Sequence, residues 1–387
     1  MACVMSREQR TSLISRVAGV LWILLSHRYT SLRFNRVFPV VKEAFSCYED
    51  KLNSLGNLPH CMNYAELLQK GFFKEKYWKF GLFMAAATSL PVLYNTVNHQ
   101  DIIGSVCAKA SVSTSAKLLD NLNDTVHSYQ EAFHSLSEYK CALQKGTYSV
   151  ENPSLRAEQS AHEIATWVHH LVPSTSGDNL EFAGDVDRLV EGQIASLQHK
   201  KDQYPSMKEY LSRICDRSIG NVWIDMDLAL LGKEKTQLKK GNEYIFKSYL
   251  IYDDVQDISG DLESNSVNSA VILGLERGIL SEGDIRQKSA QTIIQELKKA
   301  HIFEDLLCLG DVVFLKGLTI IKRCDSVIDE QGLAASLSMI RMFNIRRILR
   351  REKTLDILNT FLANHRWLEK VKQDAPEYIV EMVKYVS

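Results

Sequence analysis

Two short stretches of this chain carry aspartates at helical spacing. In LLDNLNDTVHS, the first acidic stretch, Asp120 and Asp124 are four residues apart. In YIFKSYLIYDDVQDISGDLESNSVN, the second acidic stretch, Asp253, Asp257 and Asp261 recur with the same interval. Residues four apart share one face of an α-helix, where carboxylates without a cation repel each other. Since Mg²⁺ is held by one or two carboxylates plus substrate phosphates, two such helices facing each other predict a site for Mg²⁺ and a diphosphate.

Taken alone, the first acidic stretch has a simpler interpretation as a solvated helix face. Its polar line continues from Asp124 to His127 and Glu131, almost opposite an apolar stripe. The stripe has the spacing of one helix. Its members are Leu122, Val126, Tyr129, Phe133 and Leu136. We therefore predict one continuous helix here, with acids in solvent unless the second stretch supplies a partner.

The second acidic stretch is apolar almost all round, which is typical of a helix inside a bundle. Phe246 and Leu250 lie on the same stripe as Asp253 and Asp257. A buried carboxylate without a partner is very unfavourable, so these acids should open onto a cavity or a cation. No cluster rich in His or Cys competes for a different metal.

The length and composition predict one large all-α domain. The chain has 387 residues, 45% of them hydrophobic, which is enough to bury a sizeable core. It has only seven prolines, and the long segments between them show helical periodicity with almost no strand-like alternation. No repeat or linker marks a boundary. We predict a single domain over residues 1–387, with residues 1–35 as an N-terminal helical extension.

The net charge and the cysteine content indicate the kind of partner and the cellular compartment. The net charge of −1, with both signs mixed, indicates no nucleic-acid partner. Eight scattered cysteines without a CxxC pair, and no export signal, favour reduced thiols and a cytoplasmic location. The segment VAGVLWILL imitates a signal peptide, but it is too short to span a bilayer and no cleavage site follows. We interpret it as a buried or surface-associated first helix.

The two acidic stretches together resemble the class I isoprenoid synthase superfamily. Within it, LLDNLNDTVHS is similar to the YLDNLCDR-type first motif of the large-terpene synthases, the tetraprenyl-β-curcumene synthase group of class IB terpene synthases. RVFPVVKEAFSCYEDK resembles the N-terminal helix of that group, and Gly260, Asp261 and Leu262 match the Gly-Asp-Leu that ends its second motif. The resemblance implies an isoprenoid-synthase-type helical bundle around a central apolar cavity.

The same resemblance implies a terpene synthase, a carbon–oxygen lyase acting on phosphates. It would ionise a linear prenyl diphosphate with Mg²⁺ and release diphosphate to give a cyclic or linear terpene. Asp120, Asp124, Asp253 and Asp257 are the predicted catalytic residues and metal ligands. Through Mg²⁺ they would clamp the diphosphate and neutralise charge on its leaving oxygens.

Six further residues are predicted to bind the substrate. They are Arg213, Arg217, Ser218, Gly220, Asp254 and Asp261. Ser218 and Gly220 suit a local break in a helix. By resemblance, a broken helix would line the site and point backbone carbonyls at the developing cation. In the competing interpretation both arginines form surface ion pairs with Glu209 and Asp216.

Three other features have a functional and a structural interpretation. Five aromatic residues could line a pocket for a carbocation, but each is also compatible with a place in the hydrophobic core. They are Trp167, Trp223, Phe246, Tyr249 and Tyr252. The loop from Val172 to Asp185 could close over the site or merely connect two helices. The basic run RMFNIRRILRREK gives a cationic face that could contact diphosphate or anionic lipid, as a peripheral membrane contact, or be solvated. Its charges are Arg346, Arg347, Arg350 and Arg351.

Departures from the family pattern keep two alternatives open. Asn121 and Asn123 stand where many isoprenoid synthases have a second aspartate, which leaves room for a non-catalytic helical protein. The second acidic stretch is also similar to those of prenyltransferases, either chain-elongating trans-prenyl diphosphate synthases or head-to-head synthases of the squalene and phytoene type. No arginine pair follows Asp124, which favours cyclisation or elimination over chain elongation. A homodimer is compatible with the resemblance.

Overall fold

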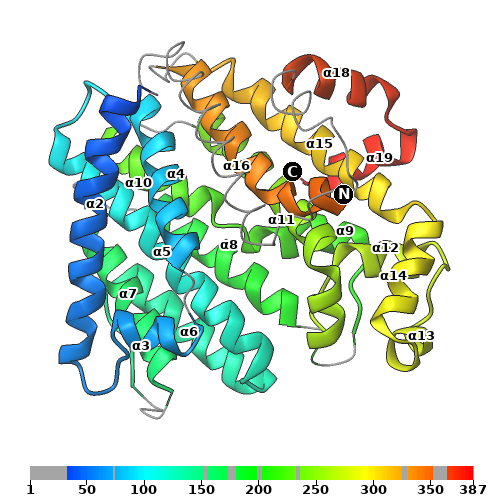
Figure 1. Ribbon diagram of the computed structural model, residues 1–387, viewed down its shortest axis with the longest axis horizontal. Coiled ribbons are helices and arrows are strands. Elements are labelled where there is room, and N and C mark those ends of the chain that lie inside the picture. Colours follow the sequence, from blue (N-terminus) through cyan, green and yellow to red (C-terminus); the bar gives the residue numbers. More distant parts are fainter. Residues whose placement is uncertain are drawn as a thin grey trace, which may run out of the picture.

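The computed structural model is a bundle of α-helices (Figure 1). It describes residues 33–72, 75–150, 155–172, 180–197, 200, 203–231, 236–324, 329–351 and 364–386. Within these ranges every regular element is helical and no strand occurs, which confirms the all-α prediction. The predicted first helix, and nearly all of the extension at residues 1–35, lie outside the described ranges.

The helices follow one another with short connections. The first half contains α2 (Phe34–Ser54), α3 (Tyr64–Gln69), α4 (Glu75–Leu93), α5 (His99–Thr125), α6 (Tyr129–Lys145), α7 (Arg156–Leu171) and α8 (Leu180–Ser196). The middle contains α9 (Met207–Ser212), the 3₁₀ turn η3 (Ile214–Arg217), α10 (Gly220–Leu231) and α11 (Thr236–Ser264). The rest contains α12 (Ser269–Glu276), α13 (Glu282–Gln287), α14 (Ala290–Lys299), α15 (Ile302–Ile321), α16 (Glu330–Arg351), α18 (Asn364–Asp374) and α19 (Glu377–Met382). Short 3₁₀ turns η1 (Leu55–Asn57) and η4 (Val383–Val386) complete the described elements.

The prediction of one continuous helix through the first acidic stretch is wrong. α5 ends at Thr125, and a new helix, α6, begins at Tyr129. Ser128 caps α6: its hydroxyl accepts from the Glu131 backbone N–H, while the Glu131 carboxylate accepts from the Ser128 N–H. This reciprocal cap stabilises a helix start and so interrupts the apolar stripe. As a result Val126 lies 52% exposed.

The loop predicted from Val172 to Asp185 is shorter than expected. α8 begins at Leu180, so residues 180–185 are helical, and residues 173–179 lie outside the described ranges. Phe182 is buried and Glu181 pairs with Lys239 of α11, so contacts with neighbouring helices extend α8 into this polar, glycine-containing sequence.

The basic run near the C-terminus lies on α16. The side chains of Arg346, Arg347, Arg350 and Arg351 are outside the described part of the structure, so that prediction is not tested. Arg341, at the start of the run, is buried and forms an ion pair with Asp311 of α15 at 2.5 Å. Among the helices that are described, none combines the length and the apolar character required to cross a lipid bilayer.

Close packing of α11 against α15 positions the second acidic stretch. Gly241 of α11 and Gly317 of α15 let the two backbones approach each other. A Cβ atom added at Gly317 would lie 2.6 Å from the carbonyl oxygen of Gly241 and 2.6 Å from Cγ1 of Ile245. Further along the pair, a Cβ at Gly310 would lie 2.6 Å from the Tyr252 ring. The absence of side chains at these glycines therefore sets the distance between the two helices.

We expect Gly317→Ala to destabilise the protein by about 1–3 kcal/mol, because the new methyl group meets backbone atoms that cannot rotate away. Gly260→Ala, also in a helix but with nothing within 4 Å of the added Cβ, should raise stability by roughly 0.5–1 kcal/mol. Urea unfolding followed by circular dichroism would measure both. Equal stability of the two variants would contradict the close α11–α15 crossing.

Candidate active site

The four predicted metal ligands lie on two helices, in the last turns of α5 and in the C-terminal half of α11. Asp120, Asp124 and Asp257 are half-buried, and Asp253 is exposed. The apolar positions around them are in the core, including Leu119 and Leu122 on α5. Each helix therefore buries one side and leaves its carboxylates near the surface of the bundle.

Lys117 of α5 is influenced by the charges of carboxylates on both acidic helices. Its Nζ lies 2.5 Å from an Asp120 carboxylate oxygen. The pKa of Lys117 is raised chiefly by the negative charge of Asp120, with further contributions from Asp253 and Asp124. Since Asp253 belongs to α11, carboxylates of both helices act on one ammonium group. A lysine three residues before Asp120 is visible in the sequence, but it was not among the predicted site residues.

Asp124 is held where its negative charge is unfavourable. Burial, followed by the neighbouring charge of Asp120, raises the pKa of Asp124 to about 6. The positive charges of Lys117 and Arg217 oppose this shift without cancelling it. A further cation beside this carboxylate would relieve the repulsion.

Arg217, at the end of η3, is a second cation at the same place. Its side chain is only 18% exposed, and its Nη2 lies 3.6 Å from Oδ1 of Asp254. Burial opposes the charged form, but the charges of Asp254, Tyr210 and Asp120 together raise the pKa of Arg217. Its buried Nε finds no hydrogen-bond acceptor among the described residues. Arg217 thus pairs with a carboxylate of α11 and is also under the charge of Asp120 on α5.

Asp254 is engaged within the protein rather than directed at a substrate. It is buried, and its Oδ2 accepts hydrogen bonds from the Tyr210 hydroxyl at 2.6 Å and the Ser269 backbone N–H at 2.7 Å. Its other oxygen faces Arg217. Asp261 accepts from the amide of Asn268 at 2.7 Å, and burial followed by the charge of Asp254 raises its pKa to about 7.

The predicted helix break is present. α9 ends at Ser212, η3 makes one tight turn, and Ser218 has an extended backbone (φ −62°, ψ 136°) before α10 starts at Gly220. The Gly220 carbonyl, however, accepts a hydrogen bond from the Asn242 amide. That carbonyl is therefore committed to α11, whereas the sequence interpretation directed carbonyls of this break at the substrate.

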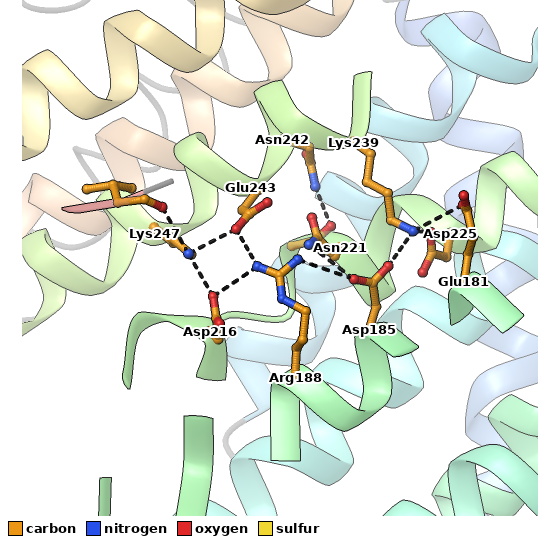
Figure 2. Close-up of polar contacts among 12 residues, drawn as sticks. Glu181, Asp185, Arg188, Asp216, Asn221, Asp225, Lys239, Asn242, Glu243 and Lys247 are labelled. Atoms are coloured by element: carbon orange, nitrogen blue, oxygen red, sulfur yellow. Dashed lines mark hydrogen bonds and ion pairs between the residues drawn. The ribbon is translucent and has the colours of Figure 1, made fainter. Parts of the chain in front are cut away.

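An ion-pair network fixes the position of η3 (Figure 2). Asp216 lies 3.1 Å from Arg188 of α8 and 2.7 Å from Lys247 of α11, and both cations also pair with Glu243. Gly192 brings α8 onto the η3 backbone, since a Cβ there would lie 2.3 Å from the Arg217 nitrogen. Asp216, which precedes Arg217, thus forms ion pairs with both α8 and α11.

The competing interpretation, in which both arginines form surface ion pairs with Glu209 and Asp216, does not describe Arg217. Arg213 is exposed, and its charge contributes to the lowered pKa of Glu209, after the larger effect of hydrogen bonds from Ser206. Arg217 does not share that arrangement, because its partner is Asp254. Of the two predicted diphosphate ligands, the structure brings only Arg217 to the acidic helices.

The five aromatic residues predicted as walls do not form one group. Trp223, Phe246 and Tyr249 are buried in a continuous row, with ring centroids 5.8 Å and 5.2 Å apart. Trp167 stacks instead on a tyrosine of α2, 5.9 Å away. Tyr252 donates its hydroxyl hydrogen to Asp311 and belongs to a different polar cluster.

The donor set suits Mg²⁺, but the protein alone does not complete a site. All candidate ligands are carboxylates, the hard oxygen donors that Mg²⁺ prefers, and the raised pKa of Asp124 marks an unneutralised acid. Among the described residues, no three His, Cys, Asp or Glu side chains are grouped closely enough to hold a metal ion.

No protein-family model and no curated protein sequence matches this chain. Solved structures do match it. It is similar to the geranylgeranyl pyrophosphate synthetase of the archaeon Geoglobus acetivorans, with a TM-score of 0.51 and 13% identity over 78% of this chain and 97% of that one. A linalool/nerolidol synthase of Streptomyces clavuligerus, in complex with 2-fluorogeranyl diphosphate, matches with a TM-score of 0.42 and 13% identity over 79% of this chain and 96% of that one. The first likeness confirms that the chain has the isoprenoid-synthase-type helical fold.

Proposed function

We propose that this protein is a class I terpene synthase, a lyase that acts on a linear prenyl diphosphate. The observation that supports the proposal is that the charges of Asp120 and Asp124 on α5 and of Asp253 on α11 all raise the pKa of Lys117, while Asp120 also raises that of Arg217. An excess of carboxylates next to one buried guanidinium suits a diphosphate that arrives together with divalent cations. The resemblance of the two acidic stretches to large-terpene synthases supports the same choice.

In this proposal each residue has a defined task. Asp120, Asp124, Asp253 and Asp257 hold Mg²⁺, which when bound stabilises negative charge on the departing diphosphate oxygens. Arg217 donates N–H groups to the same oxygens, and Asp254 holds the guanidinium in place. The C–O bond breaks with its electron pair leaving on diphosphate. The allylic cation, after any ring closure, then gives a proton to the released diphosphate, and a carbon–carbon double bond forms. Trp223, Phe246 and Tyr249 exclude water and offer aromatic faces to a cation.

A prenyltransferase is the second candidate. The similarity in fold to a geranylgeranyl pyrophosphate synthetase favours it, because that protein is named for chain elongation rather than cyclisation. Against it, the residues that follow Asp124 are TVHSYQEA and contain no arginine. The two candidates differ in whether a second isoprenoid substrate is needed.

Incubation with single prenyl diphosphates of increasing length should release diphosphate only when Mg²⁺ is present. Phosphate analysis and gas chromatography of the extract would measure the two products, diphosphate and a hydrocarbon or alcohol no longer than the substrate. A product that forms only with added isopentenyl diphosphate would replace the proposal with the prenyltransferase. No turnover of any substrate would favour a non-catalytic protein.

Asp253→Asn should lower kcat by about 100-fold or more, because a neutral amide cannot replace a carboxylate that binds a cation at the leaving group. Glu263→Gln makes the same change of charge at an exposed position of the same helix and should leave kcat within about twofold. Steady-state kinetics at saturating Mg²⁺ would compare the two. Full activity of Asp253→Asn would remove α11 from the proposed site.

Arg217→Lys should lower kcat/KM by roughly 10- to 100-fold while leaving the thermal midpoint nearly unchanged. Lysine keeps the charge beside Asp254 but lacks the planar fork that binds two oxygens at once. Arg213→Lys is the control, since Arg213 is exposed and lies beside Glu209. A larger loss in Arg213→Lys than in Arg217→Lys would show that the wrong arginine has been assigned to diphosphate.

A further inference from the structure

A second polar site lies apart from the acidic helices. A cavity of about 480 Å³ is lined by residues of α6 and α7 and by the turn that ends α5. None of the four aspartates proposed to hold Mg²⁺ lines it. Its lining includes His127, Ser135, Glu158, Gln159 and His162, none of which has a role in the proposed reaction.

Four buried polar atoms in this lining have no hydrogen-bond partner among the described residues. They are Nε2 of His127, Oγ of Ser135, Oε1 of Gln159 and Nδ1 of His162. Their residues are only 4%, 1%, 2% and 2% exposed, respectively. A buried polar atom without a hydrogen-bond partner is unfavourable, because folding removes it from water without replacing its hydrogen bond. Four of them around one cavity therefore indicate that something else satisfies them.

The hydrogen bonds of the two histidines fix which atom each presents to the cavity. Nε2 of His162 lies 3.0 Å from the carbonyl oxygen of Ser135, which can only accept, so Nε2 carries the proton. Nδ1 of His127 lies 2.8 Å from Oδ1 of Asn123 and carries the proton for the same reason. Burial lowers the pKa of both rings, that of His162 to about 4, so both are neutral near pH 7. Each ring consequently offers a bare nitrogen lone pair, which accepts a hydrogen bond.

The cavity is also negatively charged. Glu131, Glu138 and Glu158 line it, and no Lys or Arg does among the described residues. Glu158 is buried, and its Oε1 lies 3.9 Å from Nε2 of His127, too far for a hydrogen bond. The lone pairs of both histidines and the Gln159 amide oxygen are all acceptors, next to a buried carboxylate. This combination fits a cation that donates hydrogen bonds.

We propose that the cavity binds a small organic ammonium compound. Its N–H groups donate to His127, Gln159 and His162, and Glu158 neutralises its charge. A single metal ion fits less well, because no three His, Cys, Asp or Glu side chains in the described residues are grouped to hold one. A ligand that spans the cavity can reach acceptors both on the turn that ends α5 and on α7. The site does not depend on the proposed terpene synthase activity.

Isothermal titration calorimetry of the full chain with 1,4-diaminobutane tests this directly. We expect saturable binding of the diamine, and at least tenfold weaker binding of its hexamethylated analogue, which has the same charge but no N–H donors. Binding of both with equal strength would mean charge attraction alone and would overturn the donor assignment. No binding of the diamine, or tighter binding of Zn²⁺ in place of it, would overturn the proposal.

Two variants locate the binding on the protein. Glu158→Gln removes the buried charge at almost constant shape and should weaken diamine binding by about tenfold or more. Glu163→Gln, on the same helix α7 but outside the cavity, should leave the affinity unchanged. If Glu158→Gln fails to fold by circular dichroism, Glu138→Gln tests the same charge from α6. Equal affinity in the lining and control variants would place any binding elsewhere.

Discussion

The charge balance between carboxylates of α5 and α11 and the cations near them is the constraint on which the candidate site depends. The charges of Asp120 and Asp124 on α5 and of Asp253 on α11 all raise the pKa of Lys117. Burial, followed by the charge of Asp120, raises the pKa of Asp124, while Lys117, Arg217 and Lys200 oppose that shift. A further cation beside Asp124 would favour its charged form.

The scaffold around this point holds its cations rigidly. Asp254, fixed by Tyr210 and Ser269, faces Arg217, while the preceding residue Asp216 is tied to α8 and α11 (Figure 2). Such buried ion pairs contribute little net stability, since desolvation offsets their attraction. Their effect here is geometric: a short 3₁₀ turn between two helices keeps one conformation. A guanidinium positioned before substrate arrives loses little freedom on binding it.

Two polar regions lie close together in the chain. Asp124 belongs to the acidic helices, and His127, three residues later, lines the second cavity. The end of α5 at Thr125 separates them, because the chain turns before Ser128 starts α6. One short sequence thus contributes to both proposed sites, and a compound bound in the cavity would contact the turn that ends α5.

The sequence by itself determined the helical content and the candidate acids, because four-residue spacing and apolar periodicity are local properties. It also held the signal for the break after Thr125, a serine followed three residues later by glutamate, which the apolar stripe obscured. Only the tertiary structure decided which adjacent aspartate turns inward, since Asp254 is buried against Tyr210 while Asp253 is exposed. The tertiary structure alone places Arg217, and not Arg213, beside Asp254 of α11. It also brings α6 and α7 together around a shared cavity. These outcomes depend on distances between segments far apart in the chain, which local spacing does not encode.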